Sequence, residues 1–185
     1  MNLSQIPNAI TALRVLLIIP FAYSLLSDHM LAAFYYFFVA TFSDGLDGFL
    51  ARRFGWQTRL GSWLDPVADK SLMLTSYVLL GWKGLLPLWL VVVVVARDAI
   101  ILAGVALVWF IHRRIHFVPF KISKLNTALQ LLLVLMVLFS QAFSTLPEAW
   151  LQAVMVLMCL SSFLSVCAYV WEGSMTVLGY REPVR

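Results

Sequence analysis

The stretch that decides the fold reads Asp44-Gly-Leu-Asp47-Gly48-Phe-Leu-Ala51-Arg52, then eight residues, then Gly61-Ser-Trp-Leu-Asp65-Pro-Val-Ala-Asp69. The segments around it are apolar enough to cross a bilayer, where acidic side chains are costly and usually functional. In a helix, side chains three or four residues apart lie on one face. The spacing therefore predicts two helices, each with an acidic face that carries two of the four carboxylates.

This acidic motif also indicates the chemistry of the site. Four carboxylates that face one another could not all be ionised without cations, because like charges disfavour one another's ionisation. A divalent ion would supply the charge, and an all-oxygen ligand set favours Mg²⁺ or Mn²⁺ over zinc. Mg²⁺ commonly shares its coordination shell with substrate phosphates, so the motif predicts a phosphate-containing substrate. Gly48, Ala51 and Gly61 would leave room for that ligand against the helix backbones.

Each residue of the motif has a simpler interpretation when it is taken alone. Small residues in membrane helices most often serve close packing, and Asp44 after Ser43 could be a helix cap. The conjunction favours a site, because the chain has only nine acidic residues and is 62% hydrophobic.

The composition indicates an integral membrane protein, because the mean hydropathy is +0.91 and only 12% of the residues are charged. A chain of 185 residues can hold six spans of about 20 residues each. We therefore predict an all-α integral membrane protein, with six transmembrane helices in one bundle and a single domain over residues 1–185. The expected spans are Ile6–Leu26, Met30–Phe54, Gly61–Trp82, Leu86–Ile111, Ile122–Phe143 and Pro147–Trp171, with a short basic tail over residues 172–185.

The basic residues near the loops predict the orientation. All of them except Lys83 fall on one side of the six-span arrangement, and the positive-inside rule makes that side cytoplasmic. Both ends of the chain and the acidic motif would then face the cytoplasm. The net charge of +4 suits a surface that faces anionic lipid, and no basic stripe interleaved with exposed aromatics indicates a nucleic-acid partner. With no targeting segment before Ile6, we expect a bacterial inner membrane.

The motif from Asp44 to Asp69 resembles the complete signature of the CDP-alcohol phosphatidyltransferases. The similarity extends from Pro7-Asn8 and Arg14 to residues 123–130. Members of that family have six transmembrane helices, pair as homodimers, and transfer a phosphatidyl or similar group from a CDP-linked donor to an alcohol, releasing CMP. The resemblance implies this fold and reaction, with Mg²⁺ or Mn²⁺ as cofactor and membrane lipids around the protein.

The resemblance also implies a role for each matching residue. The residues expected to bind the metal are Asp44, Asp47, Asp65 and Asp69. Asp69 and Asp65 are the expected catalytic residues. Asp69 would be the general base that takes the proton from the acceptor hydroxyl. The residues expected to form the nucleotide pocket are Gly48, Ala51, Arg52 and Gly61. The candidate contacts to the donor are Asn8, Thr11 and Arg14, although helix packing explains Asn8 and Thr11 nearly as well.

A second polar cluster is the expected site of the acceptor's phosphate. Its members are Arg97, Lys121, Lys124 and Asn126. A cation such as Arg97 near the middle of a span should be paired or functional, and Asp98 is a candidate partner. Lys121 and Lys124 are equally well explained as anchors for a helix end at the membrane surface.

Two departures within the family predict the acceptor. Phosphatidylglycerophosphate synthases, which use glycerol 3-phosphate, typically show Arg-Glu in the fourth span and Gly-Lys-x-Lys-Thr at the start of the fifth. This chain has Arg97-Asp98 and Ser123-Lys124-Leu125-Asn126-Thr127, which resemble the cardiolipin synthases of the CDP-alcohol type. Asn126 in place of a Lys removes one cation, which suits the single charge of a phosphodiester. The expected reaction converts CDP-diacylglycerol and phosphatidylglycerol into cardiolipin and CMP, with glycerol 3-phosphate as the alternative acceptor.

A cation transporter or channel is the alternative from another class, because buried carboxylates in a six-span bundle would suit it too. It would predict inverted halves. The acids cluster in one half of the sequence, and the other half has no matching acidic motif. The sequence therefore favours the enzyme.

Overall fold

The computed structural model describes residues 6–54, 59–112 and 121–177. Within these ranges it describes all side chains except those of residues 6–10, 46–54, 59–66, 105, 107–109, 111–112, 121, 173 and 176–177.

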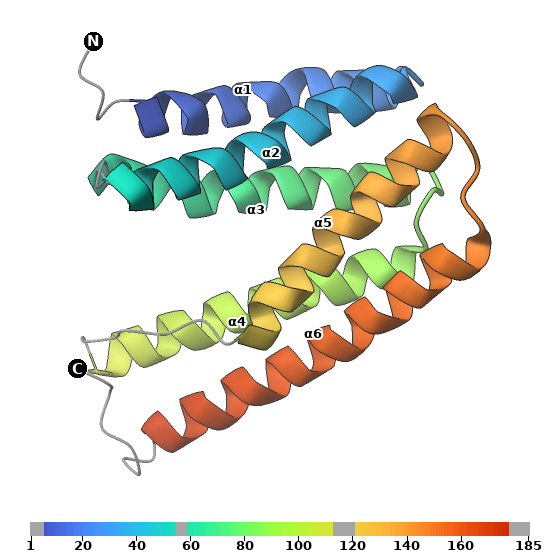
Figure 1. Ribbon diagram of the computed structural model, residues 1–185. Helices are drawn as coiled ribbons and strands as arrows, with labels where there is room; N and C mark the ends of the chain where they lie inside the picture. The colour runs from blue at the N-terminus through green and yellow to red at the C-terminus, as the bar shows by residue number, and fades with distance from the viewer. Residues whose placement is uncertain (1–5, 55–58, 113–120, 178–185) are drawn as a thin grey trace. The chain divides into compact units, whose positions relative to one another are not determined.

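The described residues form six α-helices and no strand, so the prediction of an all-α protein is confirmed. The helices are α1 (Ile6–Leu26), α2 (Met30–Phe54), α3 (Arg59–Trp82), α4 (Leu88–His112), α5 (Lys121–Ala142) and α6 (Glu148–Val177) (Figure 1). The first two match the expected spans in both bounds. The sixth continues past the expected end at Trp171 to Val177, because backbone hydrogen bonds hold a helix whether or not its side chains are apolar.

Two prolines delay the start of a helix relative to the expected spans. Pro87 precedes α4, and its carbonyl oxygen accepts a hydrogen bond from the backbone N–H of Leu90. Pro147 comes directly before the first residue of α6. Proline has no N–H to donate and disfavours the helical conformation in the residue before it, so both helices begin one residue after a proline.

The helices divide between two units. Residues 6–86 and Leu131–Pro147 form the first unit, which holds α1, α2, α3 and the later part of α5. Pro87–Gln130 and residues 148–177 form the second unit, which holds α4, the beginning of α5, and α6. The predicted acidic motif belongs to the first unit and the predicted acceptor cluster to the second.

In the first unit, α1 lies against both α2 and α3 (Figure 1). The contact with α2 buries Phe21 and Phe37 completely, with their ring centroids 5.6 Å apart. Ala33 and Ala40 lie four residues before and three residues after Phe37 and are also fully buried. These positions share one face of α2, and the small alanines let the two helix backbones approach each other.

Helices α1 and α3 end in the same type of turn. The residues after their last turns, Asp28 and Gly84, have φ angles of 60° and 70°. At each end, an N–H bonds to a carbonyl five residues earlier: His29 to Ser24 at 2.9 Å and Leu85 to Leu80 at 2.9 Å. This is the Schellman pattern, in which a left-handed residue stops the helix and leaves few carbonyls unpaired.

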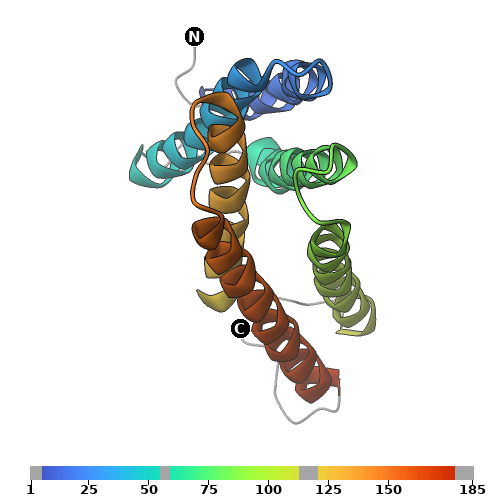
Figure 2. The ribbon, with the colours of Figure 1, turned by 90° about the vertical axis from the view of Figure 1, so that its right-hand side faces the viewer.

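Lys83 joins these two turns. Its Nζ donates to the backbone oxygen of Leu25 at 2.8 Å and forms an ion pair with Asp28. Figure 2 looks onto this end of the first unit, where α1 and α3 both stop. The bond to Leu25 satisfies a carbonyl of the last turn of α1, and a cation is favourable at the C-terminus of a helix.

Two of the described helical segments are long and apolar enough to cross a membrane. They are Ile122–Ala142 in α5 and Glu148–Glu172 in α6, and Thr11–Leu26 in α1 is a shorter apolar segment. These segments, with the overall composition, indicate a membrane protein.

Candidate active site

The four predicted metal ligands lie on two helices of the first unit. Asp44 and Asp47 belong to α2, and Asp65 and Asp69 belong to α3. Because both helices run without a break through these positions, each pair shares one helical face. Asp44 lies well inside α2, which begins at Met30, so the interpretation of Asp44 as a helix cap is wrong.

A buried arginine from α1 brings the two helices' acids together. Nη1 of Arg14 lies 2.8 Å from Oδ1 of Asp44 and 2.7 Å from Oδ1 of Asp69. The two carboxylate oxygens therefore cannot be farther apart than the sum of those distances. The Arg14 side chain is fully buried, whereas those of Asp44 and Asp69 are 41% and 47% exposed.

The printed contacts of Arg14 join one cation to two carboxylates of the described side chains. One guanidinium serves two carboxylates, and the partly exposed acids can reach water or a ligand while the cation cannot. Carboxylates at this spacing attract further positive charge, since opposite charges interact strongly where water is partly excluded. Asp44 and Asp69 offer hard oxygen donors only, which suit Mg²⁺ or Mn²⁺. The described residues thus fit the metal predicted from the sequence.

The described side chains supply only part of the ligand set that was predicted for the metal. Among them, no group of three His, Cys, Asp or Glu residues is placed to hold an ion. The side chains of Asp47 and Asp65 lie outside the described set, so their role in metal binding stays a prediction.

The predicted nucleotide and donor residues are placed mainly by their backbones. Those of the nucleotide pocket lie in the same helices as the acids, Gly48, Ala51 and Arg52 in α2 and Gly61 in α3. Their side chains, like that of Asn8 in α1, lie outside the described set. Thr11 is fully buried one helical turn before Arg14. For Arg14 the observed partners are the two acids.

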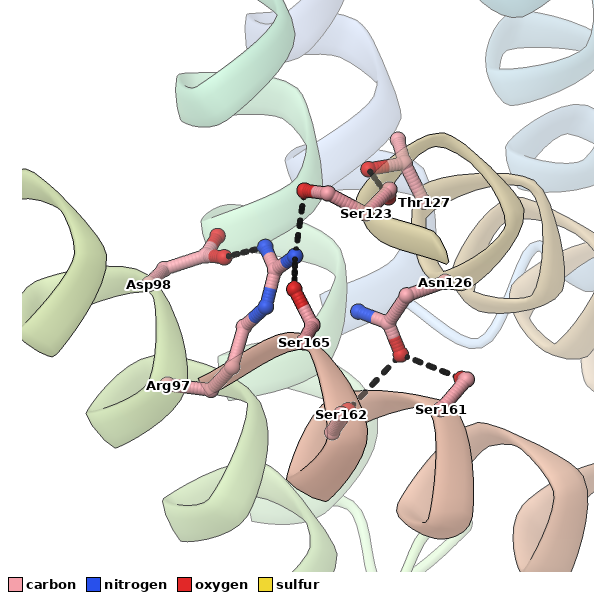
Figure 3. A network of polar contacts seen from close by, with 8 residues as sticks. All are labelled: Arg97, Asp98, Ser123, Asn126, Thr127, Ser161, Ser162 and Ser165. Atoms are coloured by element: carbon pink, nitrogen blue, oxygen red, sulfur yellow. Dashed lines mark hydrogen bonds and ion pairs between the residues drawn. The ribbon is translucent and has the colours of Figure 1, made fainter. Parts of the chain in front are cut away.

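A second buried arginine organises the predicted acceptor cluster in the second unit (Figure 3). The Arg97 side chain on α4 is only 4% exposed, and its Nη1 donates to Oδ1 of Asp98 at 2.7 Å. Its Nη2 donates to Oγ of Ser123 on α5 at 2.6 Å and to Oγ of Ser165 on α6 at 2.8 Å. Asp98 is therefore the partner of Arg97, and the pair carries no net charge.

Asn126 occupies the adjacent part of the same network and is fully buried. Its Oδ1 accepts hydrogen bonds from the Oγ atoms of Ser161 and Ser162 on α6, at 2.8 and 2.7 Å (Figure 3). The structure thus joins two of the four predicted acceptor residues, Arg97 and Asn126, in one polar network. Lys124 is exposed, and the side chain of Lys121 lies outside the described set.

Three buried serines of α6 were missed by reasoning from the sequence. Ser161, Ser162 and Ser165 are all buried and bond to side chains of α4 or α5. Ser161 and Ser165 are four residues apart and Ser162 and Ser165 three apart, which places the hydroxyls on one side of the mainly apolar middle of α6. A search for hydroxyls at helical spacing in the most apolar spans would have found them, because such groups need partners there.

The chain matches the family model described as CDP-alcohol phosphatidyltransferase over residues 4–167. A Rattus norvegicus protein named cardiolipin synthase (CMP-forming) is 32% identical over 93% of this chain and 62% of the relative. The Homo sapiens protein of the same name shows the same identity and coverage. A Streptomyces coelicolor protein of that name is 42% identical over 46% of this chain and 38% of the relative.

The chain belongs to the CDP-alcohol phosphatidyltransferase family, because the family model matches most of its length, a range that includes the acidic motif from Asp44 to Asp69. It spans 62% of the length of the rat and human relatives. Proteins of this family generally depend on a divalent metal ion.

Proposed function

We propose that the protein is a metal-dependent phosphatidyltransferase that converts CDP-diacylglycerol and phosphatidylglycerol into cardiolipin and CMP. The observation that carries the proposal is the meeting of Asp44 and Asp69, from α2 and α3, at the buried guanidinium of Arg14. Family membership supports the reaction class, and the relatives named cardiolipin synthase support the choice of substrates.

Asp69 is the proposed general base. An alcohol is a poor nucleophile at neutral pH, so a base must take its proton as it attacks the phosphorus. Nη1 of Arg14 contacts Oδ1 of Asp69 and orients this carboxylate, whose oxygens can accept a proton. The acceptor oxygen forms a bond to the phosphatidyl phosphorus, the bond from that phosphorus to the CMP oxygen breaks, and CMP leaves with the electron pair.

Asp44, Asp47, Asp65 and Asp69 would hold the divalent metal in this proposal. When bound, such an ion stabilises negative charge on the pyrophosphate oxygens. Gly48, Ala51, Arg52 and Gly61 would form the nucleotide pocket, with Asn8, Thr11 and Arg14 near the donor.

The proposed acceptor site is the network of Arg97 and Asn126. Because Asp98 already neutralises the guanidinium of Arg97, the described part of this network suits a singly charged phosphodiester better than a dianion. Glycerol 3-phosphate, a dianion, would depend more on Lys121 and Lys124.

The membrane arrangement completes the proposal. All six helices would cross the bilayer, with both ends of the chain and the acidic site on the cytoplasmic side. The diacylglycerol tails of the donor could then remain in the bilayer while its headgroup reaches the acids. We also propose a homodimer, as is typical of the family.

The test is an assay of purified protein in liposomes with CDP-diacylglycerol and Mg²⁺ or Mn²⁺. Phosphatidylglycerol and glycerol 3-phosphate are offered in parallel reactions, and CMP and the lipid product are measured in each. Cardiolipin with phosphatidylglycerol alone is the expected result. Phosphatidylglycerophosphate from glycerol 3-phosphate would keep the reaction and replace the acceptor. Cation flux without CMP release would reject the enzyme in favour of a transporter.

A further inference from the structure

The orientation of the Asn126 amide is fixed by two adjacent hydroxyls. Ser161 and Ser162 both point their Oγ atoms at Oδ1 of Asn126, while Nδ2 points toward the Arg97 side of the network (Figure 3). A hydroxyl can donate only one proton. Ser161 Oγ also lies 2.9 Å from the backbone oxygen of Met158, so its proton has two acceptors. The proton of Ser162 is directed to Asn126, which makes Ser162 the stronger determinant of the amide's orientation.

This orientation leaves a buried donor facing the network. Among the side chains that the structure describes, none accepts a hydrogen bond from Nδ2 of Asn126 or from Nε of Arg97. Buried donors without partners destabilise a protein, so they are uncommon without a reason. A ligand oxygen that reaches either donor would satisfy it.

The chemistry of the two donors indicates the kind of ligand. Arg97 contributes a guanidinium whose charge is offset by Asp98, and Asn126 contributes a neutral amide. Oxygens of a phosphodiester, which carry one negative charge, match this combination of one partly neutralised cation and one neutral donor.

We infer that Ser162 is a positioning residue for the acceptor, because its hydroxyl turns the Asn126 amide so that Nδ2 donates to an oxygen of the acceptor's phosphodiester. The inference rests on the proposed function for the identity of that acceptor. Ser161 assists, and Ser165 and Ser123 hold Arg97 in place.

The test measures binding separately from turnover. Short-chain phosphatidylglycerol and CDP-diacylglycerol are titrated in detergent against wild type and variants, with the rise in unfolding temperature as the readout. Without the hydroxyl, the amide can turn and offer an oxygen, so Ser162→Ala is expected to weaken phosphatidylglycerol binding about fivefold to tenfold. Ser162→Thr restores the hydroxyl and the binding, and the apparent affinity for CDP-diacylglycerol stays within about twofold.

Two further variants sharpen the result. Asn126→Asp keeps an acceptor for the serines but has no N–H to donate, so it is expected to weaken phosphatidylglycerol binding by at least about tenfold. Ser174→Ala is the matched control, because Ser174 lies on the same helix and bonds only locally, to the backbone oxygen of Trp171 at 2.8 Å within the described structure. It is expected to bind phosphatidylglycerol as wild type does.

The inference is overturned if Ser162→Ala binds phosphatidylglycerol like wild type. It is equally overturned if the variant loses affinity for both lipids together, since that would reflect the fold rather than the acceptor site. Turnover is followed in the same preparations. The expected binding pattern in a protein that releases no CMP would keep the positioning role and reject the proposed reaction. Normal turnover with unchanged binding in Ser162→Ala would keep the proposed reaction and reject the positioning role.

Discussion

Each unit of this protein contains a buried arginine, and the two arginines have opposite surroundings. Arg14 in the first unit contacts two carboxylates that are each almost half exposed. Arg97 in the second unit contacts one carboxylate, from the next residue of its own helix, and two neutral hydroxyls from other helices. In the printed contacts, the first arrangement joins one cation to two partly exposed carboxylates, and the second joins one cation to one carboxylate in a largely buried setting.

This difference shows that burial of a cation does not by itself define a site. Around Arg14, one cation contacts two partly exposed carboxylates, so the arrangement can still attract a cation. Around Arg97, the charge is already balanced, and what remains available are N–H groups that can donate hydrogen bonds. In the proposed reaction, the region around Arg14 would serve the donor's pyrophosphate and the region around Arg97 the phosphodiester of the acceptor.

The largest expected effect comes from Asp69→Asn. The variant keeps an oxygen that can accept from Arg14 but loses the base, so CMP release should fall about 10²-fold to 10⁴-fold. Asp28→Asn is the matched control, because Asp28 also pairs with a cation in the first unit but lies at the other end of α1. Equal losses in the two variants would contradict a catalytic role for Asp69.

Arg14→Met should lower the stability of the protein. Without the guanidinium, Asp44 and Asp69 repel each other, and the free energy of unfolding in EDTA should fall by about 1–3 kcal/mol. Mg²⁺ should recover part of this loss in the variant, because it replaces the missing positive charge. The measurement is the unfolding temperature with and without Mg²⁺. Lys83→Met, which removes the ion pair with Asp28, should show a loss that Mg²⁺ does not recover.

Arg97→Lys should act on the acceptor alone. The ammonium keeps the charge but lacks the planar fork that reaches Asp98, Ser123 and Ser165 together. We expect the KM for phosphatidylglycerol to rise about tenfold, equivalent to about 1.4 kcal/mol, while the KM for CDP-diacylglycerol changes less than about twofold. A parallel rise in both KM values would mean that the two units are not specialised as proposed.

The smallest effect is expected for Lys124→Gln. Lys124 is exposed on α5, and exposed charges generally contribute little because solvent screens them. Turnover with phosphatidylglycerol should change less than about twofold. A loss with glycerol 3-phosphate that phosphatidylglycerol does not share would assign Lys124 to the dianionic acceptor rather than to anchoring the helix.

The helices and the acidic motif could be predicted because their signals are local. Apolar runs predict the helices, and polar breaks such as Ser27-Asp28-His29 and Lys83-Gly84 predict their ends. The intervals from Asp44 to Asp47 and from Asp65 to Asp69 can be seen in the sequence without knowing which helices pack together. The meeting of Arg14 with Asp44 and Asp69 could not be predicted, because it depends on how α1 packs against α2 and α3. For the same reason, the sequence does not predict which side chains the serine hydroxyls of α6 contact.

The turn joined by Lys83 has a consequence for how the first unit can move. Helices α1 and α3 run in the same direction (Figure 1), and the described polar contacts between them include Arg14 with Asp69 and Lys83 with both Leu25 and Asp28. The contacts of Arg14 and of Asp28 are fourteen residues apart in sequence on both segments, from Arg14 to Asp28 and from Asp69 to Lys83. Asp28 and Lys83 lie just beyond the helix ends at Leu26 and Trp82. The equal spacing on the two segments sets the axial register of α3 relative to α1. A slide of α3 along α1 would break both sets of contacts at once, so movements of this unit that keep them must come from tilting or from side-chain rearrangement.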